Sequence, residues 1–350
     1  MQNQALLISQ FLPENILCFS HIYFIIFLFS YRSDILQSED NIISKEKLTN
    51  MEHLNPIKRE KKTLPLLAII AVNFLWGLDF IAIEYMMAYL SPAMFTMIRV
   101  SIGVLVLVPL CLILRGGIRI HKGDRIRVFL AGAVGMALYF SVENLGTGLT
   151  SASFSSLIMA TVPIFGMLGD RLFFGNKITP LKVACILASI LGVWLLVCGE
   201  PMGINLLGFF AMLAAAMLWA FYIVYTKSLF DRYDLLTLLT GLFIAGFITE
   251  LPIAAISQVM FHAPVILTST GILVTVGTAL ICIIAGEFGY VYAVGKLSPT
   301  TTSAFENVLP VTTVLFSFLF FGKMLTGLQV IGAIVILASV TAIALIEGKN

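Results

Sequence analysis

The feature that most constrains this chain is a series of long apolar segments that begins near residue 64. A helix needs about 20 residues to cross roughly 30 Å of hydrocarbon, and each segment reaches that length. Only helices and closed barrels can span lipid, and no segment alternates as a barrel strand would. The sequence therefore predicts an all-α polytopic membrane protein with ten transmembrane helices. They cover residues 64–89, 93–114, 126–147, 152–174, 179–198, 205–227, 235–258, 270–294, 299–321 and 324–346.

Composition narrows the functional class. The 350 residues are 59% hydrophobic and only 11% charged, whereas an average soluble domain is about 25% charged. The net charge of +2 gives no reason to expect a nucleic-acid partner. The cysteines and histidines are scattered, so we expect no metal site and no cofactor. The chain has no Walker loop, dinucleotide fingerprint, zinc helix or nucleophile elbow, and we do not expect an enzyme.

Basic residues predict the orientation of the helices. Four lie between residues 58 and 62 and five between residues 115 and 127, whereas the alternate loops at 90–92, 148–151, 199–204 and 259–269 have none. Cytoplasmic loops carry the excess of Lys and Arg. We therefore expect a multi-pass protein of the cytoplasmic membrane, with both ends of the ten-helix core in the cytoplasm. Lys323 is the exception to this pattern.

Residues 1–63 form an N-terminal extension. Its apolar stretch 16–31 is short for a spanning helix, and no basic region precedes it as in a signal peptide. Three interpretations stay open: an extra membrane-associated helix, a disordered appendage, or translation from an upstream start. In the third, Met51 is the natural start.

The apolar segments form an internal repeat. At a shift of 147 residues, Pro163 meets Pro310, and LFFG at 172–175 meets LFFG at 319–322. At a shift of 143, Trp76 meets Trp219. We therefore expect two five-helix halves, residues 64–198 and 205–346. An odd number of helices in each half inverts the second relative to the first, as in secondary transporters whose substrate binds between the repeats.

Several motifs carry a resemblance to a known family. They are FLWGLDF at 74–80, Arg99 in FTMIRV, SASFSSLIMATVPIFGML at 151–168, and SPTTTSAFENVLPVTTVLFSFLFFG followed by LQVIGAIVILASV. Across residues 64–346 the chain resembles the EamA-type transporters of the drug/metabolite transporter superfamily. It departs from them where relatives usually end each half in Gly-Glu, because Asn176 and Lys323 stand there instead.

This resemblance implies a secondary transporter that exports or exchanges small metabolites, amino acids or drugs without ATP. Its partners would be a small-molecule substrate and the lipid bilayer, and a homodimer is left open. The alternatives are an exchanger of nucleotide sugars or sugar phosphates, which would need more basic residues at cavity depth, and an intramembrane enzyme, which would need longer loops.

Ionisable residues at membrane depth are candidate functional residues, because a charge there costs roughly 3 kcal/mol. In the first half we expect Trp76, Asp79 and Arg99 to contact substrate. The alternatives are interface packing for Trp76 and a structural ion pair of Arg99 with either Asp79 or Glu84.

In the second half, the candidates for substrate binding are Tyr290, Glu306 and Asn307, and those for proton or ion coupling are Glu287 and Glu306. Pro310 leaves the Glu306 carbonyl without its helical donor, so we expect a kink and a donor from a neighbouring helix, water or substrate. The alternative for this polar stripe is a structural contact between helices.

Three other carboxyl groups have less specific expectations. We expect Glu143 to be a solvated rim residue, Asp170 to lie at the cytoplasmic interface, and Glu250 to be wetted near the outer end of its helix. At the position equivalent to Glu306, the first half has Met159, so an acidic group is expected on one side of the repeat interface.

Overall fold

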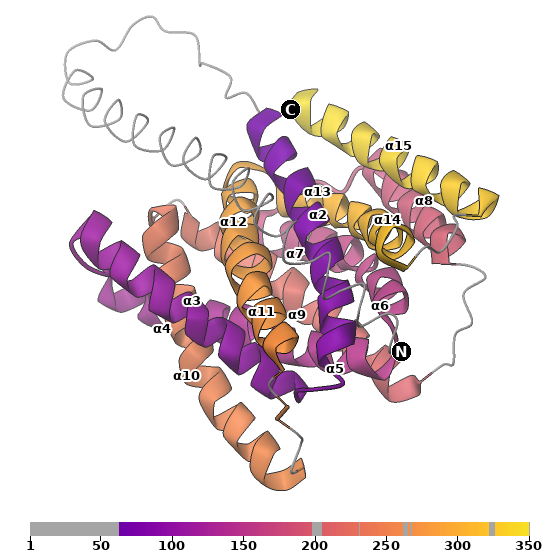
Figure 1. Cartoon of the computed structure of the whole chain (residues 1–350). Coiled ribbons are helices and arrows are strands. Elements are labelled where there is room, and N and C mark those ends of the chain that lie inside the picture. Colours follow the sequence, from indigo (N-terminus) through magenta and orange to yellow (C-terminus); the bar gives the residue numbers. More distant parts are fainter. Residues whose placement is uncertain are drawn as a thin grey trace, which may run out of the picture.

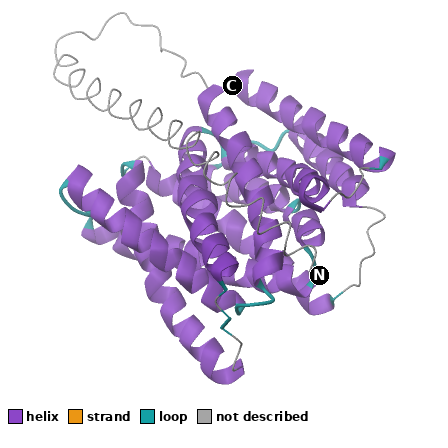
Figure 2. Ribbon diagram, in the orientation of Figure 1, coloured by secondary structure: helices purple, strands orange, loops and turns teal. Residues whose placement is uncertain are grey.

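The computed structural model describes residues 63–197, 205–230, 232–261, 265–266, 268–321 and 326–349. Throughout these ranges the chain is a bundle of helices joined by short loops (Figures 1 and 2). The N-terminal extension and Met51 lie outside the described residues, so the three interpretations of that segment stay open.

Each apolar segment of the first half corresponds to one helix or to consecutive helical pieces. The first half contains α2 (Thr63–Met86), α3 (Pro92–Arg115), the 3₁₀ turn η1 (Lys122–Asp124), α4 (Arg125–Gly132), the π-helix η2 (Ala133–Tyr139), α5 (Phe140–Leu149), α6 (Ala152–Met159), α7 (Val162–Phe174) and α8 (Pro180–Val197).

The second half repeats this order. It contains α9 (Leu206–Phe230), α10 (Leu235–Phe261), α11 (Ser269–Thr278), the π-helix η3 (Ala279–Ala285), α12 (Gly286–Lys296), α13 (Pro299–Phe305), the 3₁₀ turn η4 (Glu306–Val308), α14 (Leu309–Phe321) and α15 (Gly327–Lys349).

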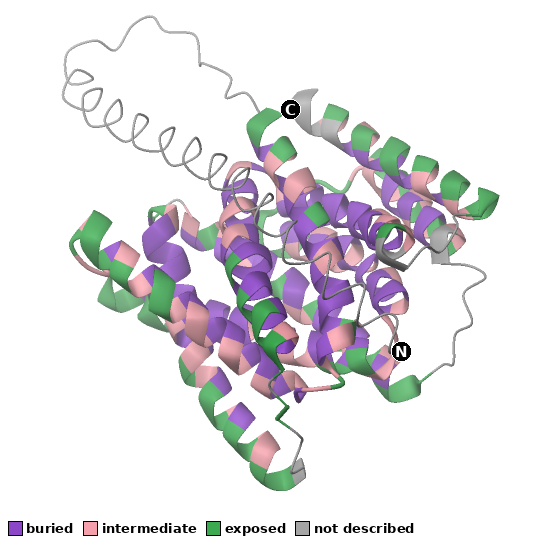
Figure 3. Cartoon of the chain, viewed as in Figure 1, coloured by how far each residue is buried: buried purple, intermediate pink, exposed green. Residues whose placement is uncertain are grey.

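Length and hydropathy qualify seven of the described helical segments as membrane spans, and the helices at Pro180–Leu195 and Gly327–Ile343 are apolar but shorter. The all-helical membrane fold is thus confirmed, while the total of ten spans stays a prediction. The distribution of side chains is that expected for a helical bundle surrounded by lipid. Large apolar side chains such as Leu105, Ile113 and Leu172 are exposed, whereas several carboxyl groups, among them Glu287 and Glu306, are buried. Figure 3 shows the buried residues concentrated where the helices meet.

Equivalent helices of the two halves pack against each other. α3 contacts α10, and α8 contacts α15. The broken segment of α6 and α7 likewise contacts its equivalent, α13 and α14, through the pairs α7 with α13 and α6 with α14. The π-helices η2 and η3 also occupy equivalent places, because their bounds are related by a shift of 146 residues. Such pairing is expected when a two-fold axis relates two repeats, and it brings the residues nearest that axis into the centre of the bundle.

The two prolines found in the sequence comparison mark breaks in equivalent segments. α6 ends at Met159 before Pro163, and α13 gives way to η4 and α14 before Pro310. The expected kink is therefore present, but its consequence for Glu306 was predicted wrongly. The carbonyl of Glu306 accepts a hydrogen bond from the N–H of Leu309, three residues later. The 3₁₀ turn thus satisfies the carbonyl without a donor from elsewhere.

A close contact joins the halves at Gly77 of α2. The Thr312 hydroxyl of α14 donates to the Asn73 carbonyl at 2.8 Å. A Cβ atom on Gly77 would lie 2.2 Å from Thr312 Oγ1. Glycine is therefore required here, as at many close approaches between membrane helices.

Candidate functional site

Four aromatic rings meet at the centre of the bundle. Trp76 of α2 and Trp219 of α9 are repeat equivalents, and their ring centroids lie 5.3 Å apart at an angle of 80°. Tyr290 of α12 lies 4.9 Å from Trp76 and 5.0 Å from Trp219, and Tyr139 of η2 lies 4.4 Å from Trp219. Edge-to-face and tilted arrangements at these distances are favourable, so the rings form one rigid group contributed by both halves.

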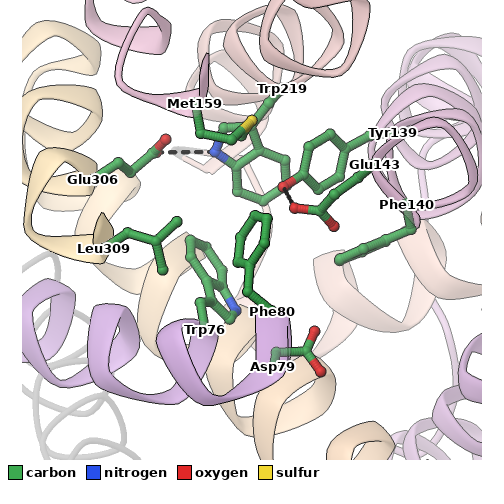
Figure 4. A pocket seen from close by; sticks show the side chains of 10 residues that line it. All are labelled: Trp76, Asp79, Phe80, Tyr139, Phe140, Glu143, Met159, Trp219, Glu306 and Leu309. Carbon is green, nitrogen blue, oxygen red and sulfur yellow. Dashed lines mark hydrogen bonds between the residues drawn. The ribbon is translucent and has the colours of Figure 1, made fainter. Parts of the chain in front are cut away.

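Glu306 lies beside this group and is 3% exposed. Its Oε1 accepts a hydrogen bond from Trp219 Nε1 at 2.9 Å (Figure 4) and another from the Tyr290 hydroxyl. Glu306 is the first residue of η4, and its carboxyl group meets donors from α9 and α12. The structure therefore brings together Glu306, Tyr290 and Trp219, which is the repeat equivalent of Trp76.

A pocket lies between the two halves at this place. Figure 4 shows its lining side chains, which come from α2, η2, α5, α6, α9 and the segment around η4. They are Trp76, Asp79, Phe80, Tyr139, Phe140, Glu143, Met159, Trp219, Glu306 and Leu309. The free space is roughly that of one water molecule. A larger molecule therefore requires the halves to move apart.

Glu143 is part of this pocket and is 3% exposed. The Tyr139 hydroxyl donates to its Oε1, and Figure 4 shows both side chains pointing into the pocket. The expectation of a solvated rim residue was wrong. That expectation rested on the distance of Glu143 from the end of its helix, whereas α9 packs against α5 and covers this turn.

The structure resolves the alternatives for Arg99. Its Nη1 donates to both carboxylate oxygens of Asp79, at 2.8 and 2.9 Å, and both residues are buried. The guanidinium also lies over the rings of Phe95 and Phe140, with its carbon 4.4 and 5.6 Å from their centroids. Glu84 does not take part, because it accepts from the Ala152 amide at 2.8 Å. Arg99 is thus bound to Asp79, which itself lines the pocket, while Arg99 does not.

Four of the expected site residues are not part of the pocket lining: Arg99 and Tyr290, whose contacts are given above, and Glu287 and Asn307. Glu287 is fully buried in α12 and accepts from the Tyr222 hydroxyl at 2.8 Å. Asn307 points in another direction, and its Nδ2 donates to Ser189 of α8. Their expected roles in coupling and substrate binding stay predictions.

The remaining carboxyl groups serve contacts between helices. Asp170 is buried, and it accepts from Thr300 of α13 at 2.6 Å and from Asn176 at 2.7 Å. The Ser141 hydroxyl donates to Glu250 at 2.7 Å, and Glu250 is fully buried rather than wetted. The sequence placed Asp170 correctly near a helix end but could not show that a helix of the other half covers it.

Four pocket residues were not selected from the sequence, namely Tyr139, Phe140, Trp219 and Leu309. The repeat provided a signal for Trp219, because its equivalence to Trp76 puts both near the two-fold axis. Tyr139 had a weaker signal, its spacing of four residues from Glu143. Nothing in the sequence distinguishes Phe140 and Leu309 from other apolar residues of their helices.

Comparisons with known proteins agree with this architecture. The EamA-like transporter family matches residues 63–198 and again residues 206–345. An uncharacterized transporter of Archaeoglobus fulgidus is 28% identical over 265 residues, which cover 76% of this chain and 93% of the relative. The inner membrane transporter YedA of Escherichia coli K12 is 25% identical over 299 residues, 82% of this chain and 93% of the relative.

Another relative carries a more specific description. It is a probable terminal-alkyne amino-acid exporter of Streptantibioticus cattleyicolor, 27% identical over 217 residues, which cover 62% of this chain and 72% of the relative. A solved crystal structure superposes with a TM-score of 0.68 at 18% identity, covering 83% of this chain and 99% of the other, and so shares the fold. With both halves matched by one family, this multi-pass membrane protein belongs to the EamA-like transporter family.

Proposed function

We propose that the chain is a secondary transporter that carries a small organic molecule across the cytoplasmic membrane by alternating access, with the pocket between Trp76 and Trp219 as its substrate site. The observation that carries this proposal is the meeting of two repeat-equivalent tryptophans over one buried carboxyl group. A site that both halves line changes its access when the halves rock against each other.

The small size of the pocket supports a mechanism in which the two halves move relative to each other. Because the free space is roughly that of one water molecule, binding of a metabolite must separate α2 from α9. The equivalent π-helices η2 and η3 lie next to this site. π-Helical turns occur frequently at functional sites, and here they end at Tyr139 and just before Gly286. Both halves thus have an irregular segment where the movement is needed.

Glu306 and Glu287 are the proposed coupling groups. A carboxyl group can take up and release one proton, and both side chains are buried among hydroxyl and indole donors. Because Glu306 lines the pocket and Glu287 does not, Glu306 is the group through which substrate and proton compete.

The alternative of a nucleotide-sugar or sugar-phosphate exchanger has less support. Such substrates carry phosphate, which proteins bind with free Arg or Lys. Among the described residues that line the pocket there is none, and Arg99 is already bound to Asp79. An export role for amino acids or drugs stays within the proposal, and one relative is described as an amino-acid exporter.

The test is a comparison of metabolites in cells and medium. Cells that overproduce the wild-type protein are compared with cells that overproduce Glu306→Gln at equal membrane abundance. We expect one or a few small molecules to change in concentration with the wild type and to return toward the background with Glu306→Gln. Identical profiles for the wild type and a strain without the protein would refute transport.

A further inference from the structure

The pocket is lined by carboxyl groups and by no basic side chain of the described residues. Three carboxyl groups line it, Asp79, Glu143 and Glu306, and its described lining contains no Lys, Arg or His. Asp79 is compensated by Arg99. Glu143 and Glu306 instead accept hydrogen bonds from neutral donors, Tyr139 for the first and Trp219 with Tyr290 for the second. Neutral donors orient a carboxyl group but supply no positive charge, so the pocket offers two carboxyl groups that have no ion-pair partner among the described residues.

Aromatic faces surround these acidic groups. Trp76, Trp219, Tyr139 and Tyr290 form the central group, and hydrogen bonds fix the two indoles. Trp76 Nε1 donates to the Cys282 carbonyl at 3.1 Å, and Trp219 Nε1 donates to Glu306. A cation within about 6 Å of a ring face is attracted by the ring, most strongly for Trp and when water is excluded.

We propose that the transported molecule is a monovalent organic cation, whose ammonium group binds at Glu306 between the rings of Trp76 and Trp219. This inference rests on the proposed function and specifies its substrate class. Figure 4 shows Met159 and Leu309 across the pocket from Asp79, and these side chains provide apolar surface for the carbon skeleton of the substrate. An ammonium group there would complete the ion pair that Glu306 lacks.

The same geometry disfavours an anion or a free amino acid. A substrate carboxylate would meet Glu143 and Glu306 in a buried site, where like charges repel strongly. Arg99 is not part of the pocket lining, because its Nη1 is bonded to Asp79 and its guanidinium lies against Phe95 and Phe140.

Three probes of one shape test the charge preference: phenylethylamine, which is a cation at neutral pH, the neutral alcohol phenylethanol, and the zwitterion phenylalanine. Their binding to the purified full-length protein in detergent is measured by quenching of tryptophan fluorescence. We expect the amine to bind about tenfold more tightly than either analogue, which equals about 1.4 kcal/mol. In Glu306→Gln, we expect the amine and the alcohol to bind about equally.

Glu250→Gln is the matched control, because Glu250 is also a buried carboxyl but bonds Ser141 outside the pocket. It should keep the tenfold preference for the amine. Equal binding of amine and alcohol, tighter binding of phenylalanine, no binding of the amine, or an unchanged preference in Glu306→Gln would each overturn the cation proposal. The metabolite comparison is independent of this result, so transport of a neutral or zwitterionic molecule would leave the proposed function standing while refuting the substrate class.

Discussion

The ion pair between Asp79 and Arg99 gives the sharpest stability prediction. Both side chains are buried, and Nη1 of Arg99 bonds both oxygens of Asp79. Removing one member of a buried pair leaves an uncompensated charge and typically costs about 3–5 kcal/mol. Replacing both members with apolar residues of similar size is often nearly neutral. We therefore expect Asp79→Asn to lower the free energy of unfolding by about 3–5 kcal/mol, and Asp79→Leu with Arg99→Met to lower it by less.

The assay is reversible unfolding in mixed detergent micelles, followed by circular dichroism. Glu84→Gln is the control, since Glu84 is exposed and accepts a hydrogen bond from one backbone amide. This variant should lower the free energy of unfolding by no more than about 1 kcal/mol, the value of one such hydrogen bond. A cost below about 1 kcal/mol for Asp79→Asn, or a double variant less stable than Asp79→Asn, would refute the reasoning. In either case the pair would not be the structural unit described above.

Two further variants test the packing and the pocket. Gly77→Ala should lower the free energy of unfolding by about 1–3 kcal/mol, because its Cβ meets Thr312; Gly123→Ala, with no heavy atom within 4 Å of its Cβ, should leave unfolding in the same micelles unchanged. Trp219→Phe keeps a ring but removes the donor to Glu306, so vesicles should show slower substrate uptake. Trp194→Phe, on a side chain that is 53% exposed, should transport normally, and equal rates for the two tryptophan variants would contradict the role of Trp219.

The sequence predicted the helical class and most segment bounds, because about 20 apolar residues have few alternatives in lipid. It also predicted the break at Pro310, since proline lacks the N–H that a continuous helix needs, and the repeat placed Pro163 at the equivalent position. It could not predict how the carbonyl of Glu306 is satisfied. A 3₁₀ turn and a donor from another helix are equally compatible with the same residues.

The site was predictable in part. Trp76, Asp79 and Glu306 were selected because a tryptophan at equivalent positions of both halves and ionisable residues within apolar segments are unusual. Glu143 was misplaced because depth along a helix does not reveal which neighbouring helix covers a residue. That information depends on packing between distant segments, as in the contact of α5 with α9.

The central claim is that one pocket between the halves opens to both sides of the membrane. Its most direct test uses a variant without the five natural cysteines and with Met159→Cys as the only thiol. A membrane-impermeant maleimide is added to right-side-out and to inside-out vesicles. A thiol reacts as its thiolate, which requires water, so the lipid-facing control Leu187→Cys, at a side chain that is 57% exposed, should stay unlabelled.

We predict that Met159→Cys is labelled from both sides, and that labelling from each side falls when substrate is bound. Labelling from one side alone, or from neither side, would contradict alternating access through this pocket.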